Sequence, residues 1–191
     1  MLDEILKQIT QAGVQHVVIT GGEPMLFDPV VDLCRELRKQ DHVITIETAG
    51  TVFRELDCDL LSVSPKMSNS TPGAGGDYEG HSSAVPLQIS RDWRDRHEAT
   101  RLDRGPLRSL LSCYVYQLKF VVKEPADFRE IESLLAELGH VDAARVLIMP
   151  EGTDSETLHA RARALVPECI RRGWRLTPRM HVDLFGNTRG T

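Results

Sequence analysis

The 191-residue chain has the composition of a soluble globular protein, with 41% hydrophobic and 27% charged residues. Its net charge of −5 does not favour nucleic-acid binding, and no apolar run approaches the roughly 20 residues that a membrane span needs. The length is sufficient for one domain with a sizeable core, so residues 1–191 are expected to form a single domain.

The four cysteines are scattered, and none lies within four residues of another: Cys34, Cys58, Cys113 and Cys169. This spacing excludes the paired-cysteine motifs of metal and redox sites. Single thiols in an acidic chain favour a reducing cytoplasm. Cys34 and Cys169 fall on apolar helix faces and are expected in the core.

The first part of the chain alternates helices and strands. Leu2, Ile5, Leu6 and Ile9 follow helical spacing, so residues 2–12 predict a helix that ends at Gly13. A strand over 16–20 follows, then a helix to residue 39 with Asp28 as its N-cap and Pro29 in its first turn. Two apolar runs predict the next strands, at 43–48 and 60–64.

A polar, glycine-rich insertion at about 68–104 interrupts this alternation, and a short helix near 106–113 closes it. The alternation then resumes with a strand at 116–122, a helix at 127–138 and a strand at 145–149. A helix over 154–172 is bent or restarted at Pro167, and one or two short strands fill 175–184. This order predicts a parallel α/β sheet covered by helices, and both a partial barrel and a doubly wound sheet fit it.

In both architectures, ligands bind at the carboxyl ends of the strands. The polar or glycine-rich segments at these ends are Thr20–Pro24, Glu47–Thr51, Ser64–Lys66, Lys119 and Met149–Gly152, with His181, Asn187 and Arg189 near the C-terminus. Gly21 and Gly22 expose backbone groups that suit an amino-acid-like ligand, and Glu23 can bind an ammonium. A simple tight turn explains these glycines equally well.

The charged side chains at the strand ends each allow a second reading. Glu47 lies in an apolar strand and needs a partner, which is a ligand hydroxyl or amine, or a structural Lys or Arg. Lys66 is either a ligand-binding cation or an ordinary surface lysine. Lys119 is expected to face the barrel interior or a carboxylate. His181 is a base or, more often for a lone histidine, a structural residue.

Six ordered segments resemble the 7-carboxy-7-deazaguanine synthases, which are radical S-adenosylmethionine enzymes. They are VVITGGEP at 17–24, IETAGT at 46–51, SVSPKMSNS at 62–70, QLKFVV at 117–122, LIMPEG at 147–152 and HVDLFGNTRGT at 181–191. The resemblance implies a partial (β/α) barrel and a carbon–nitrogen lyase of the queuosine pathway. Its reaction converts 6-carboxy-5,6,7,8-tetrahydropterin to 7-carboxy-7-deazaguanine with loss of ammonia.

The same resemblance implies which residues bind the small molecules. The cofactor-binding set for S-adenosylmethionine is Gly21, Gly22, Glu23, Glu47, Ser64, Pro65, Lys66, Met149, Pro150, Glu151 and Gly152. Thr20 and the terminal carboxylate of Thr191 are implied to contact the pterin substrate, since a carboxylate can accept two N–H bonds from a pterin edge. A reductant such as flavodoxin or ferredoxin is an implied partner, a homodimer is possible, and no direct nucleic-acid or membrane contact is expected.

One departure from the family concerns the [4Fe–4S] cluster and Mg²⁺. The family holds its cluster in a cysteine-rich loop after a first strand, and this sequence contains neither that loop nor a residue matching the magnesium ligand. The chain is therefore expected to be N-terminally truncated and inactive alone. A non-catalytic module that binds S-adenosylmethionine and pterin is the alternative, and an unrelated α/β enzyme is a third. In a truncated chain, the strand at 16–20 is expected to leave an open apolar edge.

Overall fold

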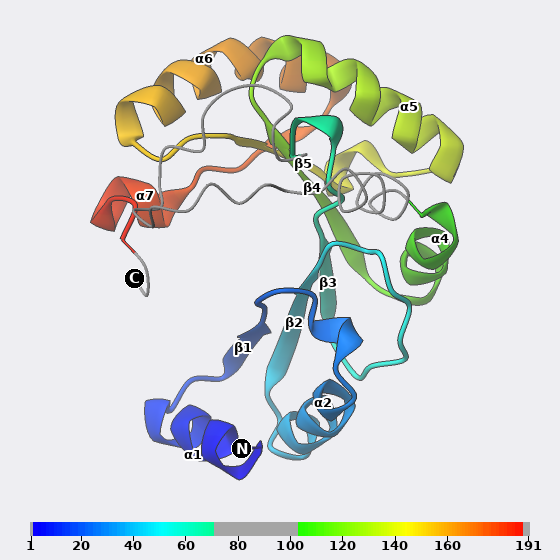
Figure 1. Ribbon diagram of the computed structural model, residues 1–191, viewed down its shortest axis with the longest axis vertical. Coiled ribbons are helices and arrows are strands. Elements are labelled where there is room, and N and C mark those ends of the chain that lie inside the picture. The colour runs from blue at the N-terminus through cyan, green and yellow to red at the C-terminus, as the bar shows by residue number, and fades with distance from the viewer. Residues whose placement is uncertain (1, 71–102, 189–191) are drawn as a thin grey trace, which may run out of the picture. The chain divides into compact units, whose positions relative to one another are not determined.

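The computed structural model describes residues 2–70 and 103–188, so most of the predicted insertion and Thr191 lie outside the described residues (Figure 1). The chain divides into two compact units. The first unit comprises residues 1–65 and 104–118, and the second comprises residues 66–103 and 119–191. No helix in the described ranges is long and apolar enough to cross a bilayer.

The strands form a six-stranded parallel sheet in the order β1-β2-β3-β4-β5-β6. Their bounds are β1 His16–Ile19, β2 Val43–Thr48, β3 Leu60–Val63, β4 Tyr116–Val122, β5 Val146–Pro150 and β6 Arg175–Leu176. A doubly wound sheet reverses its strand order at a switch point, whereas this order runs in one direction. The structure therefore has the partial-barrel type of sheet.

The first unit contains α1 (Leu2–Ala12), α2 (Pro29–Lys39) and α4 (Arg104–Cys113) together with β1, β2 and β3. The register pairs Val17 with Ile44 and Ile19 with Ile46, which aligns the carboxyl ends of β1 and β2. Its fully buried side chains come from strands, from one face each of α2 and α4, and from the turn before α2: Met25, Cys34, Leu37, Ile44, Ile46, Leu61, Val63, Leu110 and Leu118. By contrast, α1 buries no residue.

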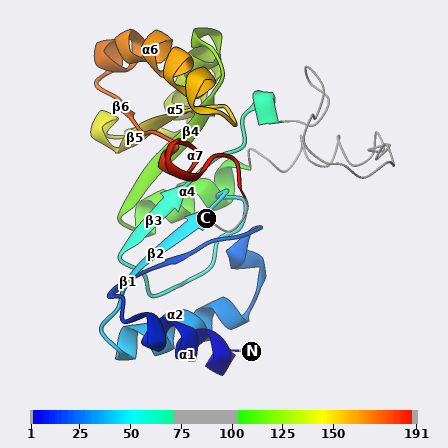
Figure 2. The ribbon, with the colours of Figure 1, turned by 90° about the vertical axis from the view of Figure 1, so that its left-hand side faces the viewer.

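The second unit contains α5 (Phe128–Leu138), α6 (Ser155–Arg172) and α7 (Met180–Phe185). Figure 2 shows α5 and α6 on the same side of β5 and β6. Phe128 stacks on Trp174 with ring centroids 5.7 Å apart, and the Arg172 guanidinium lies over both rings. These contacts join the start of α5 to the end of α6.

Three local predictions need correction. Asp28 makes no side-chain cap to α2, because its carboxylate pairs with Arg54 at 2.8 Å instead. Helix α6 runs through Pro167 without a restart. The second expected strand within 175–184 is the helix α7, since Pro178 has no N–H with which to extend the ladder of β6.

Candidate small-molecule site at the strand ends

The loop after β1 exposes bare backbone. Gly21 has φ +103° and Gly22 has φ +52°, conformations that side-chain-bearing residues rarely adopt. Apart from the chain neighbours, no heavy atom of the described residues lies within 4 Å of the position that a Cβ would take at either glycine. The predicted glycine turn is therefore an open, solvent-facing stretch of main chain, which a ligand can approach closely.

Glu23, the next residue, is half-buried and held by the end of β2. Its carboxylate accepts hydrogen bonds from the Thr48 hydroxyl (2.8 Å), the Ala49 N–H (2.8 Å) and the Met25 N–H (3.2 Å). These donors are neutral groups, so within the described ranges the charge of Glu23 is not matched by a cation. The arrangement suits an added ammonium group.

Glu47 and Thr20, both predicted site residues, lie together. The Thr20 hydroxyl donates to the Glu47 carboxylate at 3.2 Å. The Glu47 carboxylate thus has a hydroxyl partner within the protein. From the sequence, the expected partner was a ligand group or a structural Lys or Arg. The carboxyl ends of β1 and β2 therefore present two carboxylates, Glu23 and Glu47, beside the glycine turn.

Ser64 and Pro65 follow β3 in the same unit. The Ser64 N–H donates to the Thr48 carbonyl at 2.7 Å, and Pro65 is buried. The loop after β3 is thereby fixed to the loop that holds Glu23.

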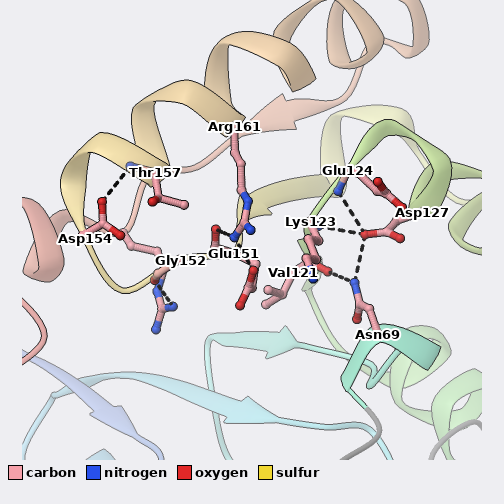
Figure 3. A network of polar contacts seen from close by, with 11 residues as sticks. Asn69, Val121, Lys123, Glu124, Asp127, Glu151, Gly152, Asp154, Thr157 and Arg161 are labelled. Carbon is pink, nitrogen blue, oxygen red and sulfur yellow. Dashed lines mark hydrogen bonds and ion pairs between the residues drawn. The ribbon is translucent and has the colours of Figure 1, made fainter. Parts of the chain in front are cut away.

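The predicted Met149–Gly152 turn of the second unit is held by two arginines that sequence reasoning missed (Figure 3). Arg161, from α6, donates to both the carbonyl and the carboxylate of Glu151, and Arg179 donates to the Gly152 carbonyl at 2.8 Å. A Cβ on Gly152 would lie 3.0 Å from Leu158. Hydrogen bonds therefore hold the main chain of the turn at two carbonyls, and the charge of Glu151 is balanced by Arg161.

Lys66 is exposed. The residues that follow it, up to Asn69, are anchored by hydrogen bonds. Asn69, three residues on, donates to the Val121 carbonyl (3.1 Å) and to Asp127 (3.0 Å) (Figure 3). The Ser68 hydroxyl donates to Glu130. These anchors tie the segment after Lys66 to the end of β4 and to α5. The Arg179–Gly152 and Asn69–Asp127 contacts join residues 27 and 58 positions apart, so no local pattern marks these two pairs.

Two other predicted residues lie on α7 and β4. His181 is exposed on α7, and Lys119 is half-buried within β4. Thr191 lies outside the described residues, so its predicted substrate contact remains a prediction.

Known proteins similar to this chain were found by sequence and by structure. The profile of the Radical SAM superfamily matches residues 1–71. A 7-carboxy-7-deazaguanine synthase from Halobacterium salinarum is 40% identical over 100% of this chain and 73% of the relative. The chain belongs to the 7-carboxy-7-deazaguanine synthase family. A second family member, from Rhodopirellula baltica, is 37% identical over 100% of this chain and 69% of its own length.

The solved structure described as QueE from Escherichia coli supports the fold. It matches with a TM-score of 0.56 and 24% identity, over 93% of this chain and 63% of that chain. The radical S-adenosylmethionine family to which these synthases belong implies S-adenosylmethionine and a [4Fe–4S] cluster. The open glycine turn and the unmatched Glu23 carboxylate fit the amino acid part of S-adenosylmethionine.

Three of the four cysteines are buried or half-buried in the described structure. Burial raises the pKa of Cys34 to about 12 and that of Cys58 to about 11, which disfavours the thiolate that binds iron. Cys169 is also buried, and Cys113 is exposed. Within the part of the chain that the structure describes, no three His, Cys, Asp or Glu side chains form a metal-binding group.

Proposed function

We propose that the chain is a radical S-adenosylmethionine carbon–nitrogen lyase of the 7-carboxy-7-deazaguanine synthase type. Its substrate is 6-carboxy-5,6,7,8-tetrahydropterin, its products are 7-carboxy-7-deazaguanine and ammonia, and its pathway is queuosine biosynthesis. The relatives, which are 7-carboxy-7-deazaguanine synthases, support this reaction. The main support for cofactor binding is the geometry around Glu23. Its half-buried carboxylate accepts from three neutral donors and lies beside an open glycine turn.

In this proposal, Glu23 binds the ammonium of S-adenosylmethionine, and the exposed backbone of Gly21 and Gly22 lies along its methionine part. The other proposed cofactor contacts are Glu47, Ser64, Pro65, Lys66 and the Met149–Gly152 turn. Thr20 and Thr191 are proposed to contact the pterin. S-adenosylmethionine supplies the radical when it is reductively cleaved, and the residues named here bind and orient it.

The remaining components are proposed from the resemblance alone. Mg²⁺ assists the reaction, flavodoxin or ferredoxin supplies electrons, and the chain forms a homodimer in the cytoplasm. A second candidate function is a non-catalytic module that binds S-adenosylmethionine and pterin. The raised pKa values of the buried Cys34 and Cys58 thiols support it.

Two measurements test the proposal. Isothermal titration with S-adenosylmethionine should show binding to the chain, and Glu23→Gln should weaken it about tenfold or more through loss of a charge-assisted contact. Glu36→Gln removes a carboxylate that pairs with Lys39 on the surface of α2, and it should change nothing. Equal binding by the chain and its Glu23→Gln variant would contradict the assignment of Glu23.

The second measurement separates the lyase from the binding module. Iron and sulfide are determined after anaerobic reconstitution, and product formation is assayed with a chemical reductant. A cluster with turnover supports the lyase. Binding of S-adenosylmethionine without a cluster supports the module.

A further inference from the structure

Thr48 connects the core of the first unit to the carboxylate of Glu23. Its side chain is at the end of β2, and the residue is only 4% exposed. Its hydroxyl lies 2.8 Å from each Glu23 carboxylate oxygen and 3.0 Å from the Gly50 nitrogen. The Gly50 N–H donates to the threonine oxygen, so the single hydroxyl proton is directed to Glu23.

Gly50 is itself fixed by packing below it. It has φ +78°, and a Cβ at this position would lie 2.8 Å from Val63 and 3.1 Å from Leu107. The backbone at Gly50 is therefore held against the core, which fixes the N–H that orients Thr48. A continuous set of contacts runs from Val63 and Leu107 through Gly50 and Thr48 to Glu23.

We infer that Thr48 is a positioning residue that fixes the Glu23 carboxylate for the ammonium of an amino acid ligand. Without the Thr48 hydroxyl, Glu23 keeps two backbone donors, Met25 N–H and Ala49 N–H, but loses the only side-chain hydroxyl that spans both of its oxygens in the described structure. This inference rests on the proposed binding of S-adenosylmethionine at Glu23. It adds that selectivity for the amino acid part depends on a buried threonine that does not itself touch the ligand.

The test compares two ligands and three variants. Thr48→Val has nearly the same shape without a hydroxyl, Thr48→Ser keeps the hydroxyl, and Thr45→Val removes another buried threonine hydroxyl from the same strand. The Thr45 hydroxyl contacts His16 at 2.8 Å, so Thr45→Val leaves the Glu23 contacts in place. Titration uses S-adenosylmethionine and 5′-methylthioadenosine, which lacks the amino acid part.

The expected result is a loss that is specific for one ligand and one variant. Thr48→Val should bind S-adenosylmethionine about tenfold more weakly and 5′-methylthioadenosine unchanged, since only the former has the ammonium. Thr48→Ser and Thr45→Val should bind both ligands like the unaltered chain. If Thr48→Val does not fold, as judged by circular dichroism, Thr48→Ala replaces it because it adds no branched group.

Other outcomes overturn the inference in distinguishable ways. Unchanged binding of S-adenosylmethionine by Thr48→Val, or an equal loss for both ligands, contradicts the positioning role alone. An equal loss in Thr45→Val shows that the effect is general to this strand. Failure of the unaltered chain to bind S-adenosylmethionine overturns the proposed cofactor binding and, with it, this inference.

Discussion

At the scale of single residues, both packing and backbone conformation require glycine at position 50. Its φ of +78° disfavours a side chain, and a Cβ there would lie 2.8 Å from Val63. We expect Gly50→Ala to lower the free energy of unfolding by about 2–4 kcal/mol, the sum of backbone strain and overpacking. Urea unfolding followed by circular dichroism measures this change.

Gly13→Ala is the matched control for Gly50→Ala. Gly13 has φ +63°, but beyond its chain neighbours no heavy atom in the described part of the chain lies within 4 Å of its Cβ position. Its substitution should therefore cost only the backbone term, about 1–2 kcal/mol. Equal destabilisation by the two substitutions would contradict the close packing inferred at Gly50.

At the scale of elements, a charged cluster joins α2 to the amino ends of two strands. Arg38, near the end of α2, donates to Asp57 at 2.9 Å and pairs with Asp59 at 3.1 Å. Asp59 also accepts the Ile44 N–H at 2.7 Å. The bond from Ile44 and then the Arg38 guanidinium hold the pKa of Asp59 below its usual value.

Because the folded pKa of Asp59 is lowered, its contribution to stability is present above the unfolded pKa of about 3.9 and is lost as the pH falls through the lower folded value. We expect Asp59→Asn to be less stable than the unaltered chain at about pH 7. The difference should shrink as the pH falls below about 4. Urea unfolding at several pH values between these limits measures it.

The control for this pH dependence is Asp32→Asn, also a change at a carboxylate that pairs with an arginine of α2. Asp32 and Arg35 are 61% and 59% exposed, and such surface pairs contribute little to stability. Asp32→Asn should match the unaltered chain throughout. A difference between Asp59→Asn and the unaltered chain that does not vary with pH would contradict the electrostatic origin.

The elements that sequence periodicity predicted share a regular pattern of apolar residues. Leu134 and Leu110 are buried on predicted helices, and Ile44 and Phe120 on predicted strands. The missed features depend on contacts between distant parts of the chain. Asp28 has the sequence position of a cap, but Arg54 competes for its carboxylate.

The candidate site was predictable to a similar extent. The glycine turn, Glu23 and Glu47 could be named because they follow apolar runs, and parallel strands bring their carboxyl ends to one edge. The residues that hydrogen-bond these site residues could not be predicted from the sequence. Thr48 acts through a bond to a residue 25 positions away, and Arg179 through one 27 positions away.

At the scale of the whole molecule, β1 is the edge strand whose exposure has the clearest consequence. Among the described strands it pairs only with β2, and Val18 at its centre is 51% exposed. An unpaired apolar edge can pair with another chain. We therefore expect self-association that increases with concentration, measured by sedimentation velocity.

Placing a charge on that edge should reverse the association, because a lysine disfavours strand addition. Val18→Lys should reduce the associated fraction. Val14→Lys adds the same charge at a similarly exposed valine, 46% exposed, outside the strand. If net charge alone controlled association, both substitutions would act equally, whereas edge pairing requires that only Val18→Lys acts. A monomer with a reversible melt that does not depend on concentration would show that the edge of β1 does not pair between chains.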